Sequence, residues 1–339
     1  MEARKTTLEN MEVKKTFFGK NVLVTGGTGF VGSHLVEELI SQGANVVTTF
    51  EYNDPFSYFM VREMNKKVVM ADIDVGQFDK VFDLITKFEI DYIFHLAAQA
   101  IVTTAYNNPR RTLESNIMGT TNILESVRLF PKVKAVMVAS SDKAYGKLVE
   151  GKYSYAEIDP LKGDHPYDVS KSATDLIANM YAKTYQIPVV VTRFGNIYGE
   201  GDNNFSRIIP GIMNALIKNE TLELRSDGKA VRDYLYVKDV ARGYLMLAEK
   251  IDETRGEAYN FGSNDTLSVI ELIKAIEKAL NKKVPYKILN IAKNEIPYQS
   301  LGYEKIKRLG WKNKENIKTT AKKIYRWYRE IVEEKDLEL

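Results

Sequence analysis

The chain has 339 residues, a formal net charge of +3 and no cysteine. This length suffices for one large α/β unit with a smaller cap, or for two domains. The near balance of charge gives no sign of a nucleic-acid-binding surface. The lack of cysteine excludes disulfides and thiol nucleophiles, and only three dispersed histidines, His34, His95 and His165, are present, so no metal site is expected.

No apolar run is long enough to span a bilayer, so no membrane association is expected. Residues 1–17 are charged and lack the apolar core of a signal peptide. These observations predict a cytoplasmic protein, and they assign no function to the N-terminal segment.

The elements expected along the chain alternate between strands and helices. Strands are expected over residues 21–24, 44–49, 67–70, 91–96, 135–139 and 188–192, and helices over 33–41, 78–88, 109–130 and 167–185. This alternation predicts a Rossmann-type, doubly wound parallel sheet. After Arg193 the pattern becomes irregular, and the clearest later helices are residues 267–280 and 317–332. We therefore expect a nucleotide-binding domain over 18–193 with about 233–262. A smaller C-terminal α/β substrate-binding domain would cover 194–232 and 263–339.

A glycine-rich loop, Thr-Gly-Gly-Thr-Gly-Phe-Val-Gly at residues 25–32, lies between the first expected strand and helix. Gly26, Gly29 and Gly32 would provide a tight turn, a close backbone approach to a pyrophosphate, and close helix–strand packing. An anion would then lie at the N-terminus of the helix, where free N–H groups and the helix dipole favour it. A bare glycine triplet can be only a turn, but the flanking strand and helix favour a dinucleotide site.

Tyr167 and Lys171 are four positions apart on one expected helix face. The charge of Lys171 favours the phenolate of Tyr167, which can then act as a base near neutral pH. Ser141, Asp142 and Lys143 follow the strand over 135–139. Asp142 and Lys143 alone would fit a solvated ion pair, but they lie at the carboxyl end of a central strand, where ligands bind. Together with the glycine loop, this set predicts a redox enzyme that uses a nicotinamide.

The residues after the second and third strands indicate which nicotinamide is bound. Glu51 is a plausible partner for the ribose hydroxyls of NAD. No Arg or Lys lies between residues 50 and 61 to hold a 2′-phosphate, which favours NAD over NADP. Asp72 and Ile73 are placed to bracket the adenine, although Asp72 fits an ordinary strand-end acid equally well.

A series of motifs resembles, in order, the extended short-chain dehydrogenase/reductases that act on nucleotide-diphosphate sugars. The motifs are residues 25–32, Leu96-Ala97-Ala98-Gln99, Asn116-x-x-Gly119-Thr120, Ser140-Ser141-Asp142-Lys143-x-Tyr145-Gly146, Tyr167-x-x-x-Lys171 and Arg193-x-x-Asn196-x-Tyr198-Gly199. The resemblance extends from about Phe18 to Trp311. It implies an NAD site formed by Gly26, Thr28, Gly29, Phe30, Val31, Gly32, Glu51, Asp72, Ile73, Leu96, Ala97, Ala98, Gln99, Tyr167 and Lys171.

Within that family, Ser141-Asp142-Lys143 looks most like the CDP-glucose 4,6-dehydratases, where Ser-Asp-Lys takes the place of Thr-Asp-Glu. The resemblance implies that Tyr167 takes the O4 proton of a nucleotide-diphosphate hexose while hydride passes from C4 to NAD, and that Ser141 binds that oxygen. Asp142 would protonate the leaving C6 hydroxyl and Lys143 would take the C5 proton. Hydride then returns to C6 and leaves a 4-keto-6-deoxy sugar.

Other polar residues have structural or binding interpretations. Asn196, Arg207 and Arg232 are the candidate substrate ligands, and Arg193 is a further candidate for the diphosphate, because arginine matches phosphate geometry. Asn116 and His95 are expected to be structural, with His95 satisfied at a strand end. The residues leave the nucleotide base and the sugar open.

Several alternatives remain at this stage. A 4-epimerase would use Ser141, Tyr167 and Lys171 without needing Asp142 and Lys143. A reductase would release its cofactor, and a regulatory dinucleotide-binding protein would not need the intact catalytic set. The helices over 109–130 and 167–185 look apolar on more than one face. Related enzymes form a four-helix bundle from these helices, so a homodimer is expected.

Overall fold

A computed structural model describes residues 16–52, 54–147, 152–291 and 297–337, with side chains in the last helix described as far as residue 333. All but the last two residues of the N-terminal segment 1–17 therefore lie outside the described part. Along the described chain, no helix is both long and apolar enough to cross a membrane. Nor do His, Asp and Glu side chains of the described residues form a group of three or more that could hold a metal ion.

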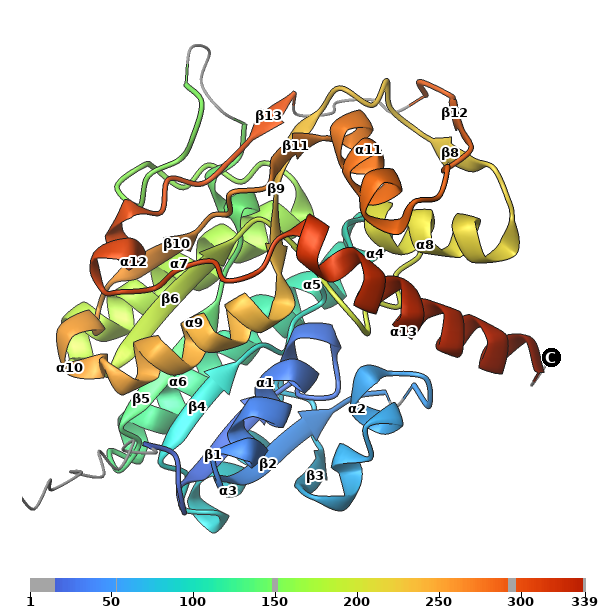
Figure 1. Ribbon diagram of the computed structural model, residues 1–339. Helices are drawn as coiled ribbons and strands as arrows, with labels where there is room; N and C mark the ends of the chain where they lie inside the picture. The colour runs from blue at the N-terminus through green and yellow to red at the C-terminus, as the bar shows by residue number, and fades with distance from the viewer. Residues whose placement is uncertain (1–15, 53, 148–151, 292–296, 338–339) are drawn as a thin grey trace, which may run out of the picture.

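The centre of the molecule is a seven-stranded parallel sheet (Figure 1). Its order is β10-β6-β5-β4-β1-β2-β3, with every neighbouring pair parallel. The strands are β1 (Asn21–Thr25), β2 (Asn45–Phe50), β3 (Val69–Asp72), β4 (Tyr92–His95), β5 (Ala135–Ala139), β6 (Val189–Phe194) and β10 (Ala258–Phe261). The chain runs outward from β1 in both directions, so the order reverses between β1 and β4. Ligands of such sheets bind at the carboxyl ends beside this reversal.

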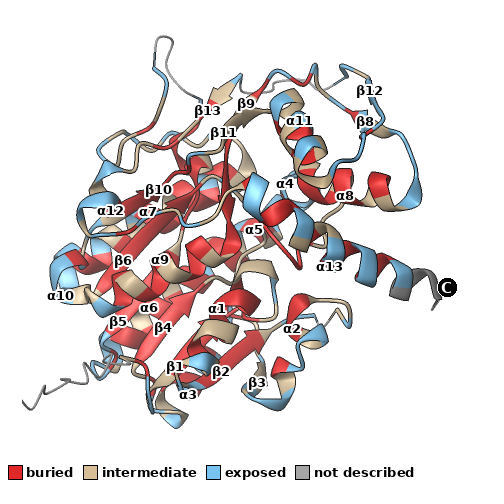
Figure 2. Ribbon diagram, viewed as in Figure 1, coloured by how far each residue is buried: buried red, intermediate tan, exposed pale blue. Residues whose placement is uncertain are grey.

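The sheet is buried on both faces because successive side chains point to opposite sides. Val22 and Val24 belong to one apolar core, and Leu23 between them belongs to the other. Helices α1 (Phe30–Ser41) and α9 (Val237–Glu249) cover the first face, and α3 (Phe78–Lys87), α6 (Gly119–Leu129) and α7 (Pro166–Tyr185) cover the second (Figure 1). Figure 2 shows the strands buried in the middle of these layers. The predicted Rossmann-type fold is confirmed.

The helix expected over 109–130 is interrupted. It consists of α5 (Pro109–Leu113), a π-helical turn η2 (Glu114–Met118) and α6, preceded by the short helix α4 (Val102–Asn107). Asn116 lies in the π turn and accepts from the backbone N–H of Gln99 at 2.8 Å. Its amide also donates to the Gln99 carbonyl at 3.1 Å and to Ser170 Oγ at 2.8 Å. The widened turn places this side chain between α7 and the segment that follows β4, which confirms the structural interpretation of Asn116.

A second layer lies over the carboxyl ends of the sheet (Figure 1). It contains a four-stranded sheet of β7 (Asn196–Tyr198), β9 (Val231–Tyr236), β11 (Thr266–Ser268) and β13 (Tyr298–Gln299). A two-stranded sheet joins β8 (Leu222–Leu224) and β12 (Tyr286–Ile288). Helices α8 (Ile208–Lys218), α11 (Val269–Leu280) and α13 (Ile317–Leu337) pack together beside them. The remaining short elements are α2 (Tyr58–Val61), η1 (Met64–Lys66), η3 (Asp142–Tyr145), α10 (Ile251–Thr254) and α12 (Glu304–Arg308).

Candidate active site

A cavity of about 510 Å³ lies at the carboxyl ends of β1, β4, β5 and β6, beneath β7 and β9. It is lined by side chains from both layers. Twelve of the residues singled out from the sequence are among them: Phe30, Val31, Leu96, Ala98, Ser141, Asp142, Lys143, Tyr167, Lys171, Asn196, Arg207 and Arg232. The fold thus brings the expected catalytic residues and the expected substrate ligands to one cavity.

Phe30 and Val31 of the glycine loop line this cavity, whereas its glycines do not line it and are required by close packing. Gly26 has a φ of +69°, and a Cβ there would lie 3.0 Å from the backbone of Ala97. A Cβ on Gly32 would lie 2.3 Å from the carbonyl oxygen of Gly26. Gly29 is the N-cap of α1, and no described side chain forms a capping hydrogen bond with this start of the helix. The first N–H groups of α1 are therefore suited to an anion.

Glu51 has a partner that the local sequence did not indicate. Its carboxylate is 2.7 Å from the Arg111 guanidinium, which also lies 2.9 Å from Asp74. Arg111 belongs to α5, far along the chain from residues 50–61, so the sequence around Glu51 does not indicate this cation. Since two carboxylates already share this guanidinium, the pairing does not provide the open cation that a 2′-phosphate requires.

Tyr167 and Lys171 lie at the start of α7, where Pro166 occupies the first turn and fixes where the helix begins. Lys171 Nζ donates to the Ala139 carbonyl at 2.8 Å and lies 6.0 Å from the centre of the Tyr167 ring. Burial raises the pKa of Tyr167 to about 12, while a hydrogen bond with Ser141 acts in the opposite direction. Burial also lowers the pKa of Lys171 to about 8. In the protein without its ligands, burial therefore opposes the phenolate of Tyr167 that the charge of Lys171 is expected to favour.

Ser141, Asp142 and Lys143 form the turn that follows β5. Ser141 caps η3: its Oγ accepts from Lys143 N at 3.2 Å and donates to Asp142 Oδ1 at 3.0 Å. Asp142 is buried, whereas Lys143 is half-buried and its Nζ donates to Gln299 Oε1. Among the described residues, Asp142 and Lys143 form no ion pair with each other. The two side chains therefore do not form the solvated ion pair that their sequence alone would also fit.

The structure corrects the interpretation of Arg193 as a candidate ligand of the substrate diphosphate. It lies within β6, only 4% exposed, and forms a two-pronged ion pair with Asp175 at 2.7 and 2.8 Å. Its guanidinium also donates to Tyr145 Oη at 2.5 Å, and Tyr145 donates to Asn260 at 2.8 Å. Arg193 does not line the cavity. It braces the η3 turn from behind and has no donor directed at a substrate diphosphate.

The residues from the second layer approach from the opposite side. Asn196 lies on β7 and Arg232 on β9, and both line the cavity. Arg207 immediately precedes α8, with its side chain 42% exposed and its guanidinium 3.0 Å from the buried carboxylate of Asp202. Burial raises the pKa of Asp202, and the charge of Arg207 opposes this effect. Asp202 thus orients Arg207 towards the cavity.

His95 is satisfied as expected. Its ring nitrogens lie 2.8 Å from Thr25 Oγ1 and 3.1 Å from Thr120 Oγ1. Burial lowers the pKa of His95 to about 3, so the ring is neutral at physiological pH. The side chain ties β1 and β4 to α6 and has no direct part in the cavity.

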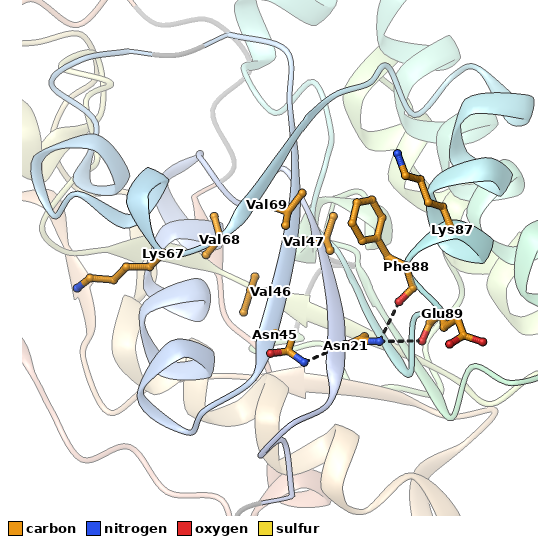
Figure 3. Close-up of a pocket in the computed structure, with 10 residues that line it drawn as sticks. All are labelled: Asn21, Asn45, Val46, Val47, Lys67, Val68, Val69, Lys87, Phe88 and Glu89. Atoms are coloured by element: carbon orange, nitrogen blue, oxygen red, sulfur yellow. Dashed lines mark hydrogen bonds between the residues drawn. The ribbon is translucent and has the colours of Figure 1, made fainter.

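A second hollow, of about 520 Å³, lies at the opposite, amino end of the sheet (Figure 3). Val46, Val47 and Val69 line it from the strands, and Lys67, Lys87 and Glu89 line its rim. Asn21 bridges the strand starts by accepting from Asn45 at 3.1 Å and donating to the Phe88 carbonyl at 2.9 Å. None of the candidate catalytic or ligand-binding residues lines this hollow.

The class of protein follows from comparison with known families and structures. The chain belongs to the NAD dependent epimerase/dehydratase family, whose model matches residues 22–262. This confirms the resemblance to the extended short-chain dehydrogenase/reductases that act on nucleotide sugars. NAD is the cofactor of the family, and the uncapped start of α1 with its tightly packed glycines fits a dinucleotide.

Individual relatives include both dehydratases and epimerases. The chain is 30% identical to CDP-glucose 4,6-dehydratase of Salmonella typhimurium, over 96% of this chain and 95% of the relative. The structure of dTDP-glucose 4,6-dehydratase from Streptomyces venezuelae, with NAD bound, superimposes with a TM-score of 0.81 at 27% identity, covering 91% of this chain and 97% of that one. UDP-glucose 4-epimerase of Thermotoga maritima, with UDP-glucose, gives a TM-score of 0.82 at 28% identity, covering 92% and 99%.

Several residues around the cavity were not found by sequence reasoning. Asp202 and Tyr244 line it, and Gln299 contacts Lys143 from β13. Asp202 stands in a glycine-rich loop, where an acid five positions before Arg207 was the available signal. Gln299 carries no local signal, because 156 positions separate it from Lys143.

Proposed function

We propose that this protein is a nucleotide-diphosphate-hexose 4,6-dehydratase that converts its substrate to the 4-keto-6-deoxy sugar. The observation that carries the proposal is the presence of Asp142 and Lys143 in the same cavity as Ser141, Tyr167 and Lys171. Epimerisation needs only the latter three groups, whereas elimination of water needs an additional acid and base. The Ser-Asp-Lys resemblance and the similarity to a CDP-glucose 4,6-dehydratase support the same reaction.

Bound NAD would accept hydride from C4 of the sugar and later return it to C6. We propose that residues 25–32 hold its diphosphate, that Glu51 binds its ribose, and that Asp72 and Ile73 bracket its adenine. Leu96, Ala97, Ala98 and Gln99 would complete the NAD site. In this proposal, residues 18–193 with about 233–262 form the NAD-binding domain. The substrate-binding domain comprises 194–232 and 263–339.

The proposed roles of the protein's own groups follow their positions. Tyr167 takes the O4 proton, with Ser141 hydrogen-bonded to the same oxygen. Because burial raises the pKa of Tyr167 to about 12, the phenolate requires nearby positive charge, which Lys171 and an oxidised nicotinamide would supply. Lys143 takes the C5 proton, and Asp142 protonates the C6 hydroxyl as it leaves. Asn196, Arg207 and Arg232 would bind the substrate diphosphate.

The test is mass spectrometry of purified protein incubated with CDP-, UDP-, GDP- and dTDP-hexoses, without added NAD. Loss of one water from one substrate supports a dehydratase with resident cofactor and identifies the nucleotide. An unchanged mass with a new stereoisomer on chromatography would make the protein a 4-epimerase. In that case, Asp142 and Lys143 have no catalytic role.

The epimerase is the second candidate, favoured by the similarity to the Thermotoga maritima UDP-glucose 4-epimerase structure. The double substitution Asp142→Ala with Lys143→Ala separates the two. It should spare an epimerase and stop a dehydratase. A simple reductase is distinguished by its need for a stoichiometric supply of reduced cofactor.

We also propose that the protein is a cytoplasmic homodimer. Apolar side chains are exposed on α5, η2 and α7, three elements that pack together, namely Leu113, Met118, Val169, Leu176 and Met180. Exposed apolar side chains on neighbouring elements are typical of a subunit interface. Analytical ultracentrifugation tests the dimer, and a strictly monomeric profile at micromolar concentration would contradict it.

A further inference from the structure

Lys143 is contacted by a residue from the far end of the chain. Its Nζ donates to the side-chain oxygen of Gln299, the last residue of β13. Gln299 is only 1% exposed and does not line the cavity, whereas Lys143 does. Gln299 therefore contacts Lys143 from outside the cavity lining.

The amide of Gln299 is an unexpected group at a buried position. Its Nε2 is buried and has no hydrogen-bond partner among the described residues. A buried donor without a partner destabilises a fold, and an apolar side chain of similar volume would avoid that penalty. Packing alone therefore favours Leu or Met at position 299. The feature that an apolar residue could not reproduce is the oxygen that accepts from Lys143.

The backbone around Gln299 is firmly placed. β13 runs parallel to β9, with Gln299 opposite Arg232. The next residues are held as well: Leu301 N donates to buried Asp233 at 2.8 Å, and Ser300 O accepts from Tyr155 N at 3.1 Å. Pairing with β9 and the bonds of the following residues therefore hold the Gln299 oxygen in place beside Lys143.

We infer that Gln299 is a positioning residue, which holds the Lys143 amine in the orientation that removes the sugar C5 proton. The inference deepens the proposed dehydratase function and rests on it. A neutral amide oxygen suits this task, because it accepts a hydrogen bond from either the ammonium or the free amine. A carboxylate in the same place would favour the ammonium, which cannot accept a proton.

The balance of the step is simple. The C5–H bond breaks, its proton passes to the nitrogen lone pair of Lys143, and its electrons form the C5=C6 double bond. The C6–O bond breaks as Asp142 gives its proton to the leaving hydroxyl, which departs as water. When hydride adds to C6, Lys143 returns a proton to C5 and regains its lone pair. Gln299 exchanges no proton with the substrate in this sequence.

The test uses the full-length holoenzyme with CDP-glucose, or whichever of the four nucleotide-hexoses the wild type dehydrates. The variants are Gln299→Met, Gln299→Leu and Gln299→Glu, with Tyr298→Phe as the matched control on the same strand. Three quantities are measured: kcat and KM for water loss, incorporation of solvent deuterium at C5, and the absorbance of reduced nicotinamide during a single turnover.

We expect Gln299→Met and Gln299→Leu to lower kcat about 10- to 100-fold with little change in KM. C5 exchange should slow equally, and reduced nicotinamide should accumulate, because C4 oxidation proceeds while elimination is delayed. Their thermal midpoints should equal or exceed that of the wild type. Gln299→Glu should also be slow, but should recover at higher pH as the amine is freed. Tyr298→Phe should resemble the wild type.

A double variant shows whether Gln299 acts through Lys143. Lys143→Met with Gln299→Met should be no slower than Lys143→Met alone, because the group being positioned is already absent. Normal C5 exchange in both apolar variants, additive losses in the double variant, or failure of both apolar variants to fold would each overturn the inference. If the wild type dehydrates none of the four substrates, the proposed function itself fails. This outcome is distinct from failure of the Gln299 inference, which is judged only by comparing variants with an active wild type.

Discussion

The two ends of the central sheet carry hollows of nearly equal size and very different chemistry. The amino-end hollow, about 520 Å³, is lined by strand starts and by surface lysines and a glutamate. The carboxyl-end cavity, about 510 Å³, contains the buried groups Ser141, Asp142 and Lys171. Loops at the carboxyl ends of a doubly wound sheet diverge around the reversal of strand order and leave room for a ligand. Volume alone therefore does not identify the site, and the buried polar groups do.

The largest effect on activity is expected from removing the phenol hydroxyl of Tyr167 in the carboxyl-end cavity. Tyr167→Phe should lower kcat for product formation about 10³-fold, because phenylalanine has no hydroxyl that could take the O4 proton. Substrate affinity, measured by calorimetry, and the thermal midpoint should stay near the wild-type values. Activity within tenfold of the wild type would mean that the cavity does not work as proposed.

The next effect distinguishes the two reactions that the cavity could support. Lys143→Met should slow water elimination about 10²-fold and allow reduced nicotinamide to accumulate after C4 oxidation. Asp142→Asn should slow elimination as well, because the amide cannot donate a proton to the leaving hydroxyl. The measurement is single-turnover absorbance with mass analysis of the product. Undiminished turnover in both variants would favour the epimerase.

The substrate side of the cavity should respond through binding. Arg207→Ala removes a charge-assisted contact to the diphosphate, which is worth about 1.5–3 kcal/mol, so KM should rise roughly 10- to 100-fold. Asp202→Asn should raise KM less, since it only loosens the orientation of Arg207. Arg110→Ala is the control, because its side chain is 87% exposed and pairs with Glu114 on the surface. An equal effect of the control would show that general charge, and not the site, is responsible.

A smaller effect is expected on stability at low pH. The pKa of His95 is lowered to about 3 from an ordinary value of 6.5, so the unfolded chain binds a proton that the folded chain refuses. The stabilising effect of the neutral ring is complete above pH 6.5 and declines as pH falls towards 3, by about 1.4 kcal/mol at pH 5.5.

Urea unfolding between pH 7 and 5 measures this effect. His95→Asn should be less stable at pH 7 and should lose less stability on acidification than the wild type. His165→Asn, at a partly exposed position, should retain the wild-type slope. Identical slopes for wild type and His95→Asn would contradict the assignment.

The smallest effect is expected at the amino-end hollow. Asn21→Ala removes the bonds to Asn45 and to the Phe88 carbonyl, and should lower the free energy of unfolding by about 1 kcal/mol. Turnover and KM should not change, because the substitution lies at the opposite end of the sheet from the cavity. A clear loss of activity would assign this hollow a role that its chemistry does not indicate.

The sequence was informative wherever one local rule decides the structure. Apolar β-branched runs predicted the central strands, and β5 begins and ends where expected. The glycine loop and the Tyr167–Lys171 spacing predicted where the cofactor domain places its reactive groups. Other strands differed by one or two residues, because strand ends depend on hydrogen bonds to neighbours that a single segment does not contain.

The misjudged residues depend on distant partners. Arg193 looked like a phosphate ligand until its strand placed it beside Asp175 from α7. Glu51 appeared to have no cation nearby, yet Arg111 reaches it from 60 positions away. In both cases the charge was visible in the sequence, but the pairing required knowledge of which helix packs beside which strand.

The sequence by itself therefore determined the fold class, the family and the reactive groups that follow each strand, because these depend on local periodicity and on short motifs. Only the tertiary structure decided which charges are consumed in ion pairs, how burial changes the pKa of Tyr167, and that Gln299 contacts Lys143. Those properties arise from burial and from contacts between segments far apart in the chain, and neither is encoded in any single stretch of residues.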